Sequence, residues 1–262
     1  MPVLDKEYLL TAQQMAEFVS LGYLMLPEVV PSGLNQAVHH DLQSYHGAGG
    51  RFWFENPHIR EVFEIPVVKG ALQSLVGPEP IYDHSAVHVV GPSHSQAQSY
   101  HADSIIDTRP LGFDVQAFYF CHDTPDEMGP TLILPGSHLR RVNTASIARY
   151  KNVAGQRRLA CKAGTVVLMH HGIWHCAQPN RTETMRYMFK LRLRPRVEQR
   201  NLFNGDDVDD PEVRQLIYQA YQPWQGNEAR LDHMARARLW RYVVGNDAAD
   251  VSFEGAFARM KI

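Results

Sequence analysis

The stretch "SYHADSII" at positions 99–106 places a histidine and an aspartate two residues apart in a segment that resembles a short β-strand. Side chains at positions i and i+2 of a strand point to the same face, so His101 and Asp103 can reach one metal ion together. The pair alone is weak support, because a chain with 14 histidines can contain this spacing by chance. A third ligand is needed before the pair predicts a metal site.

Candidates for that ligand lie in "VVLMHHGIWHCAQPN", which contains His170, His171 and His175. His171 and His175 would share one face of a helix, but the β-rich approach and Gly172 argue against a helix here. His175 stands at the expected end of a strand, before a polar turn, where its side chain can remain open to a site. Two imidazoles and one carboxylate on one face of a metal are the ligand set of non-haem Fe(II) oxygenases.

Four segments of the chain follow the order of segments in a known family. They are "LTAQQMAEFVSLGYLMLPEVV", "YHADS", "EMGPTLILPGSH" and "AGTVVLMHHGIWHCAQPNRTETMR". They resemble the phytanoyl-CoA dioxygenase family of Fe(II)/2-oxoglutarate oxygenases, and the third is the most specific because it is close to the family's "NGATxxxPGSH". The resemblance implies that His101, Asp103 and His175 bind Fe(II), that 2-oxoglutarate and O2 are co-substrates, and that no catalytic residue is needed beyond the metal centre.

The family places an arginine on the next strand, 11 positions after the distal histidine, where it holds the far carboxylate of 2-oxoglutarate. Counting from His175 gives Arg186, whereas counting from either preceding histidine ends in the expected turn. The spacing therefore selects both residues. A guanidinium suits the task because its planar fork bonds a carboxylate bidentately and keeps its charge. Without the resemblance, Arg186 would be interpreted as one of several solvent-facing arginines.

The resemblance also implies 2-oxoglutarate contacts from Gln98, three residues before His101, and from Thr131. Gln98 has the opposite strand parity from His101, so it reaches the site only if the strand begins or bulges there. His88 is a further candidate for the co-substrate, with a hydrogen-bonded sheet histidine as the alternative. Phe118 takes the place of a tryptophan that many relatives carry beside the co-substrate, and we expect it to be a core residue.

Two differences from the family pattern bear on the reaction. Many relatives carry a serine two residues after the distal histidine, and this chain has Ala177, so carboxylate binding would depend on Arg186 and other donors. The halogenating branch replaces the aspartate of the first pair by a small residue so that chloride can bind iron. Asp103 is present here, which favours hydroxylation or a related C–H oxidation over halogenation.

The substrate is less well defined by the sequence. The Gln98 and Thr131 pattern favours a compact metabolite or natural-product intermediate, and an acyl-CoA is the alternative within the family. Phe52 and Trp53 could form an aromatic wall of the substrate pocket, or they could pack between elements. Arg109 could bind an anionic group of the substrate.

Two other classes of function share the same ligands. A zinc enzyme could use the three residues to activate water without redox chemistry. A binding protein on the same fold could have lost catalysis. Arg186 at the 2-oxoglutarate spacing argues against the first class, and the intact ligand set argues against the second.

The elements that must position these residues change along the chain from helix to strand and back to helix. Helices are expected at 11–20, with Thr11 as N-cap, at 32–47, 66–76, 211–221 and 227–244. Strands are expected at 81–91, 97–105, 113–121, 130–137, 157–164, 165–172 and 184–195. Short strands with no helical pattern between them predict an antiparallel sandwich or barrel. The predicted fold is mainly β with flanking helices (α+β), and the resemblance narrows its core to a double-stranded β-helix of the jelly-roll or cupin-like kind.

Length and composition limit the organisation and the partners. The 262 residues, 44% of them hydrophobic, predict one domain over 1–262, with a helical part at 1–80, a β core at about 81–197 and a helical part at 198–262. The formal charge of −2 provides no basic field for nucleic acid. The three cysteines form no CxxC pair, which is typical of reduced thiols. No leader or membrane-spanning run is recognisable, so we expect a cytoplasmic monomer or homodimer with a small-molecule substrate and no membrane partner.

Overall fold

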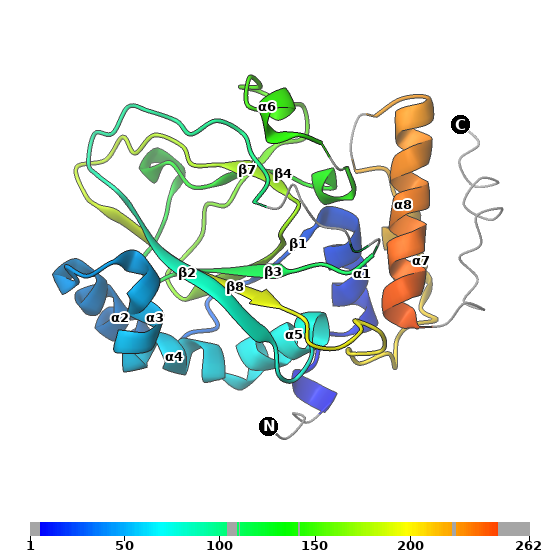
Figure 1. Cartoon of the computed structure of the whole chain (residues 1–262), viewed down its shortest axis with the longest axis horizontal. Helices are drawn as coiled ribbons and strands as arrows, with labels where there is room; N and C mark the ends of the chain where they lie inside the picture. The colour runs from blue at the N-terminus through cyan, green and yellow to red at the C-terminus, as the bar shows by residue number, and fades with distance from the viewer. Residues whose placement is uncertain (1–5, 104–108, 110, 141, 222–223, 246–262) are drawn as a thin grey trace.

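The computed structural model describes residues 6–103, 109, 111–140, 142–221 and 224–245 (Figure 1). Two antiparallel sheets form its β core, with strand orders β1-β6-β3-β8-β2 and β5-β4-β7. The five-stranded sheet contains β1 (Tyr23–Leu26), β2 (Ile81–Val90), β3 (Val115–Phe120), β6 (Thr165–His170) and β8 (Arg186–Arg194). The three-stranded sheet contains β4 (Leu132–Leu134), β5 (Arg157–Arg158) and β7 (Trp174–Cys176).

Helices precede and follow these strands, as the sequence predicted. The N-terminal helices are α1 (Ala12–Leu21), α2 (Ser32–Ser44), α3 (Phe52–Glu55), α4 (Pro57–Glu64) and α5 (Pro66–Val76). The later ones are α6 (Thr144–Ile147), α7 (Pro211–Tyr218) and α8 (Asn227–Val244), and single 3-10 turns lie at Lys6–Tyr8, Gly49–Arg51, Asp126–Met128 and Ser137–Leu139. Figure 1 shows α3, α4 and α5 on one side of the larger sheet and β4 and β7 on the other. No helix in the described ranges is long and apolar enough to cross a membrane.

Local signals in the sequence explain where the first helix begins and ends. The Thr11 side chain accepts a hydrogen bond from the Gln14 backbone N–H, and the Gln14 side chain accepts one from the Thr11 backbone, which completes a capping box. Gly22 ends the helix with φ of 79°, a left-handed conformation that glycine adopts without a Cβ penalty. The helix predicted at 11–20 is confirmed.

The larger sheet separates two differently composed halves of the core. Directly opposed residues of antiparallel strands point to the same face, and successive residues alternate between faces. Tyr187, Phe189, Leu191 and Leu193 of β8 therefore share the outer face, which packs against the helices. Arg186, Met188, Lys190 and Arg192 share the inner face, which looks toward the smaller sheet.

Some of the predicted elements were wrong. Residues 97–103 are not a strand, and His101 makes only an isolated bridge to His175. The preceding exposed segment supplies polar residues instead of the alternating apolar side chains that a half-buried strand needs. Of the strand predicted at 157–164, only Arg157–Arg158 forms a strand. Helices α3 and α4 form in a region for which no helix was predicted.

Candidate metal centre

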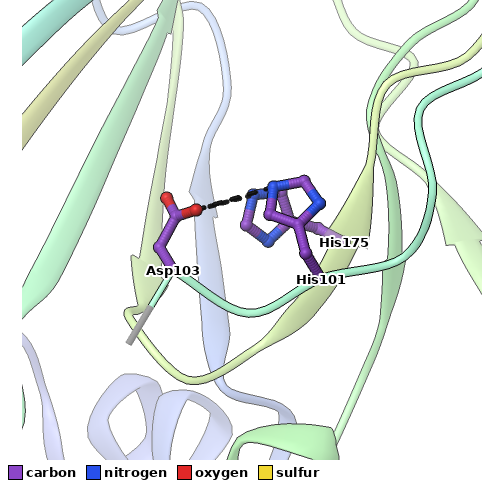
Figure 2. Close-up of side chains that lie close together, drawn as sticks. All are labelled: His101, Asp103 and His175. Carbon is purple, nitrogen blue, oxygen red and sulfur yellow. Dashed lines mark ion pairs between the residues drawn. The ribbon is translucent and has the colours of Figure 1, made fainter. Parts of the chain in front are cut away.

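Three side chains direct donor atoms into the space on the inner side of the larger sheet. One ligand atom from each of His101, Asp103 and His175 lies within 4.8 Å of the other two (Figure 2). The Asp103 Oδ1 atom stands 3.5 Å from His101 Nε2 and 4.0 Å from His175 Nε2. No other group of three such residues in the described part of the chain has this geometry. The two imidazoles and one carboxylate match the 2-His-1-carboxylate donor set.

Backbone hydrogen bonds hold the two histidines beside each other. The His101 N–H donates to the His175 carbonyl at 3.0 Å, and the His175 N–H donates to the His101 carbonyl at 2.9 Å. His175 is the central residue of β7 and lies opposite Ile133 of β4. The His101 and His175 rings are 4.3 Å apart between centroids. The antiparallel bridge thus brings together two side chains that are far apart in the sequence.

The second ring nitrogen of each histidine fixes which nitrogen faces the centre. The Nδ1 atom of His101 lies 3.0 Å from the Ser99 carbonyl oxygen, and that of His175 lies 3.0 Å from the Ile173 carbonyl oxygen. Because a carbonyl only accepts, each Nδ1 carries the proton and donates it. The Nε2 lone pairs are left to point at Asp103, which is the arrangement that metal-ligating histidines commonly use.

The protonation states suit cation binding. Burial lowers the pKa of His175 to about 4, although the Asp103 carboxylate acts in the opposite direction. Burial also acts to raise the pKa of Asp103, but His175 and Lys190 outweigh it and leave that pKa well below its ordinary value. At neutral pH the group therefore offers a neutral His175 imidazole and an ionised carboxylate, the forms that coordinate metals.

Two cations of β8 contact Asp103, and neither was predicted from the sequence as a site residue. Lys190 Nζ donates to Asp103 Oδ2 at 3.0 Å, and Arg192 Nη1 donates to the Asp103 carbonyl oxygen at 3.3 Å. The signal that could have revealed them is strand parity, since both residues share a face with Arg186. Of the basic residues in this strand, only Arg186 had been assigned a role from the sequence.

Arg186 begins β8 on the inner face and is 3% exposed. Its Nη1 atom has no hydrogen-bond partner within the described residues, although the atom is buried. Burial lowers its pKa to about 10, so the guanidinium remains charged at neutral pH. A buried cation with an unmet donor is costly unless an anion joins it, and a carboxylate fits its planar fork.

His88 and Phe118 also border the centre. His88 lies on β2 opposite Met188 and remains exposed to solvent. Partial desolvation of its ring and the nearby Lys190 charge both lower its pKa from the ordinary value. The charges of Asp103, Arg186 and His101 also affect His88, which places it among them. Phe118 is 2% exposed and sets its ring edge-on to His175, with 6.1 Å between centroids.

Gln98 and Thr131 flank the other side of His175. Gln98 is exposed, and its Oε1 accepts from the Ala177 backbone N–H at 3.2 Å. Thr131 is buried, and its carbonyl accepts from the Leu159 N–H, which extends the pairing of β4 with β5. Thr131 therefore has the same parity as Ile133, the residue opposite His175.

The segment "PGSH" supports β7 and carries no chemistry of its own here. The Ser137 hydroxyl accepts from the Trp174 N–H at 2.8 Å and donates to the Leu134 carbonyl at 2.6 Å. His138 Nε2 lies 3.0 Å from the Val19 carbonyl oxygen, which joins the turn to α1. These contacts give the turn a structural role.

The residues considered for the substrate lie elsewhere or are already paired. Phe52 is fully buried and packs on Phe189, with centroids 5.9 Å apart. Trp53 stacks on Phe189 at 6.3 Å, so both aromatics lie on the outer face of the sheet, away from the donor atoms. This is the packing role that the sequence left open. Arg109 forms an ion pair with Asp114 at 2.6 Å.

The two other histidines near His175 point into a separate cluster. The His170 ring stacks on His171 with centroids 4.6 Å apart and lies 4.9 Å from the ring of His138. The Asp114 backbone N–H donates to His171 Nδ1 at 2.7 Å. Neither histidine joins the group formed by His101, Asp103 and His175.

A comparison with models of protein families gives one match that spans more than half of the chain. The model described as "Phytanoyl-CoA dioxygenase (PhyH)" matches residues 37–188. That range includes all three residues of the candidate centre and Arg186. A comparison with curated proteins gives no match.

Solved structures share the fold at low sequence identity. The carbocyclase SnoK of nogalamycin biosynthesis is 20% identical over 83% of this chain and 94% of its own, with a TM-score of 0.60. HygX from Streptomyces hygroscopicus, solved with nickel and 2-oxoglutarate, is 16% identical over 71% and 87%, with a TM-score of 0.57. The epimerase SnoN, solved with Fe3+, α-ketoglutarate and nogalamycin RO, is 16% identical over 70% and 82%, with a TM-score of 0.59. The predicted double-stranded β-helix core with flanking helices is confirmed.

Proposed function

The chain belongs to the phytanoyl-CoA dioxygenase family of 2-oxoglutarate-dependent non-haem iron enzymes, and we propose that it oxidises a C–H bond of a small-molecule metabolite or natural-product intermediate. The favoured outcome is hydroxylation, with release of succinate and CO2. The observation that carries the proposal is the convergence of His101 Nε2, His175 Nε2 and Asp103 Oδ1 on the same inner face as a buried Arg186, whose Nη1 has no partner within the part of the chain that the structure describes. A keto acid bound to a metal requires side chains that hold the metal and a cationic side chain that binds its far carboxylate.

The donor set fits Fe(II). Two imidazole nitrogens and one carboxylate oxygen bind a divalent metal from one side and leave positions for other ligands. Bound Fe(II), with 2-oxoglutarate and O2, would supply the oxidising chemistry that no side chain of this protein can provide. His101, Asp103 and His175 would hold the ion, and the backbone carbonyls behind each Nδ1 would keep both rings oriented.

The remaining inner-face residues would bind and orient the co-substrate. Arg186 would receive the far carboxylate of 2-oxoglutarate through its unpartnered Nη1. His88 lies among Arg186, Lys190 and Asp103 and is neutral at pH 7, so it can offer a hydrogen bond without adding charge. Phe118 would exclude water beside His175, and we propose a supporting part for Thr131 and Gln98 at the rim of the same region.

The substrate class rests on two kinds of support. The SnoK, SnoN and HygX structures have the same fold as this chain. SnoK and SnoN both come from the biosynthesis of one natural product, nogalamycin. In this chain, Asp103 keeps a carboxylate at the place where halogenating relatives have a small residue. Both points favour C–H oxidation of a compact molecule, with no nucleic acid or membrane as substrate.

Anaerobic reconstitution tests the iron and co-substrate assignment directly. Purified protein loaded with Fe(II) and 2-oxoglutarate should develop a weak visible charge-transfer band. The band should disappear in His175→Ala and persist in His46→Ala, which removes an exposed histidine far from the centre in the sequence. Admission of O2 with a panel of candidate metabolites should then produce succinate, and the correct substrate should accelerate its release.

Three outcomes would contradict the proposal or one of its ligands. A native protein that shows neither the band nor succinate with any metabolite would remove the oxygenase assignment. A native protein that binds zinc tightly and hydrolyses esters or amides, without affinity for 2-oxoglutarate, would favour the non-redox metal enzyme. Full hydroxylating activity in Asp103→Gly would show that the aspartate is not a ligand.

A further inference from the structure

The ammonium group of Lys190 lies in the interior, where a lysine is rare. Lys190 occupies the inner face of β8 between Ala86 of β2 and Phe118 of β3, and 9% of the residue is exposed. Burial of an unpaired ammonium carries a large desolvation penalty, so such a group is expected only where a specific anion contacts it. The neighbours across both strands are apolar and cannot fill that role.

Asp103 is the anion that meets it. Lys190 Nζ lies 3.0 Å from Asp103 Oδ2, and the two side chains are 11% and 16% exposed. No second acidic partner of Lys190 occurs among the residues that the structure describes. The contact is specific to one oxygen, because the other, Oδ1, faces His101 Nε2 and His175 Nε2.

Fold stability does not account for this pair. A buried ion pair usually returns little more than it loses in desolvation, and apolar residues of similar volume often stabilise a fold equally well. The two residues directly opposite Lys190, Ala86 and Phe118, are apolar. A methionine at position 190 would satisfy packing, so the charge is explained by the carboxylate that it contacts.

A second contact from β8 secures the backbone of the same aspartate. Arg192 Nη1 donates to the Asp103 carbonyl oxygen at 3.3 Å. Arg192 is itself anchored, because its Nη2 donates to Asp114 Oδ2 at 2.8 Å and Asp114 is 2% exposed. The described residues that lead to Asp103, 97–103, form no strand, so β8 supplies the fixed frame for its carbonyl and its carboxylate.

We infer that Lys190 is a positioning residue that holds Asp103 Oδ2 so that Oδ1 alone is presented to the metal with the two histidine Nε2 atoms. The inference rests on the proposed function, since it assigns a role at the same centre. Lys190 acts through Asp103 and touches no reacting atom. It links the strand that carries Arg186 to the segment that carries the first two ligands, so both halves of the centre share one rigid element.

Metal binding without turnover tests the inference. Co(II) serves as an air-stable probe, with its affinity measured by calorimetry and its coordination by visible absorption. Lys190→Met should weaken Co(II) binding by about 10-fold to 100-fold and change the spectrum, because the freed carboxylate can rotate or bind through both oxygens. Lys190→Arg retains a donor of sufficient reach and should restore the native spectrum.

A second background separates positioning from charge. The Lys190 cation also repels the bound metal, and this repulsion is present whether or not residue 103 is ionised. In the Asp103→Asn background, Lys190→Met should therefore cause no weakening, and relief of repulsion can tighten binding. The effect of Lys190→Met in the two backgrounds should differ at least tenfold, which is the coupling that a double-mutant cycle isolates.

The chain offers a matched control for the lysine substitution. Lys162 pairs with Asp123 at 2.7 Å in the same lysine–aspartate manner, but both side chains are exposed. Lys162→Met should leave Co(II) affinity and spectrum unchanged. Thermal unfolding of the metal-free variants checks that each of them is folded before the metal is added.

The outcomes are distinguishable. Native-like affinity and spectrum in Lys190→Met, or an equal effect in both backgrounds, would overturn the positioning role while leaving the proposed function intact. A native protein whose Co(II) binding does not depend on His175 or Asp103 would overturn the proposed function itself.

Discussion

Strand β8 presents two faces with opposite compositions. Its outer side chains, Tyr187, Phe189, Leu191 and Leu193, are apolar, buried and packed under the N-terminal helices. Its inner side chains include Arg186, Lys190 and Arg192, and each of these cations is largely removed from solvent. The same strand thus contributes apolar packing on one face and, in the proposed function, the groups that bind ligands on the other.

The difference extends to the tolerance of unmet hydrogen bonds. On the inner face, the buried Arg186 Nη1 has no partner among the described residues, and neither amide atom of Gln116 has one there. Such atoms each cost roughly 1–3 kcal/mol relative to satisfied ones. The outer face gains its free energy from apolar burial, which needs no directional partners. Apolar burial on the outer face therefore offsets the free-energy cost of the unmet hydrogen bonds on the inner face.

The largest expected effect comes from the outer face. Phe189 is fully buried among Phe52, Trp53 and Phe63, so Phe189→Ala should lower the free energy of unfolding by about 3–5 kcal/mol. Urea titration followed by circular dichroism measures this loss. Co(II) affinity of the folded fraction should stay native. A large loss of Co(II) affinity in a Phe189→Ala sample that is fully folded would show that the two faces do not have separate roles.

The inner face should show the reverse pattern in Arg186→Met. Loss of the guanidinium fork should weaken 2-oxoglutarate binding to the metal-loaded protein about 100-fold, equivalent to about 2.7 kcal/mol. Stability should not fall, because the substitution removes a buried cation with an unmet donor. Arg194→Met is the matched control, since Arg194 has the same parity on β8 but is half exposed. Unchanged 2-oxoglutarate affinity in Arg186→Met would contradict the assignment.

Acid titration distinguishes the scaffold behind the inner face from the centre itself. Burial lowers the pKa of His138 to about 3, below the ordinary value of 6.5. The unfolded chain therefore takes up the proton first, so this contribution to stability is complete above about pH 6.5 and declines as the pH falls. At pH 5 the loss is roughly 2 kcal/mol for this one residue.

Paired unfolding titrations measure that contribution. Between pH 7 and pH 5, His138→Gln should lose roughly 2 kcal/mol less stability than the native chain. The exposed His46 gives the control, and His46→Gln should follow the native curve. An identical acid slope in the native chain and in His138→Gln would show that other groups govern the acid sensitivity.

The smallest expected effect concerns the turn behind β7. Ser137→Ala leaves the buried Trp174 N–H without its acceptor, which should cost about 1–2 kcal/mol of stability in a thermal or urea unfolding experiment. Because Trp174 precedes His175, Co(II) affinity should fall by less than tenfold. Ser137→Thr retains the hydroxyl and should lose less Co(II) affinity than Ser137→Ala. Equal losses in the two variants would show that the change in side-chain volume, and not the hydrogen bond, causes the effect.

Elements with local signals could be predicted from the sequence. The capping box at Thr11, the strand patterns of β3, β6 and β8, and the bounds of α8 follow from side-chain periodicity and caps. The helix α4 had an equally clear signal that went unused. Asn56 caps it by accepting from the Ile59 N–H, and Pro57 fills the first turn.

The candidate centre could be predicted as a set of residues but not as a geometry. The spacing from His175 to Arg186 and the family segments indicated the candidate residues, because residue types and their spacing can be read directly from the sequence. The strand expected around His101 does not form, since its segment pairs with β7 only at that residue. Which segment pairs with which depends on contacts distant in sequence, and no local pattern encodes them.

Placement of a side chain on one face or the other was the hardest property to predict. Trp53 stacks on the outer face because α3 places it over Phe189, and the sequence showed only three adjacent aromatics. The burial of Lys190 is not predictable from its own segment for a related reason, because β2, β3 and Asp103 surround its side chain. Both follow from packing between elements and not from either segment alone.

The reciprocal backbone hydrogen bonds between His101 and His175 also connect metal binding to folding. The two residues belong to distant parts of the chain, and their bridge lies on the side of β7 opposite to its pairing with β4. Contacts of such long range form late, because loop closure must precede them. The donor atoms of the centre therefore do not exist as a unit in a partly folded chain, and the first tight binding of a metal ion would mark the moment at which the β core closes.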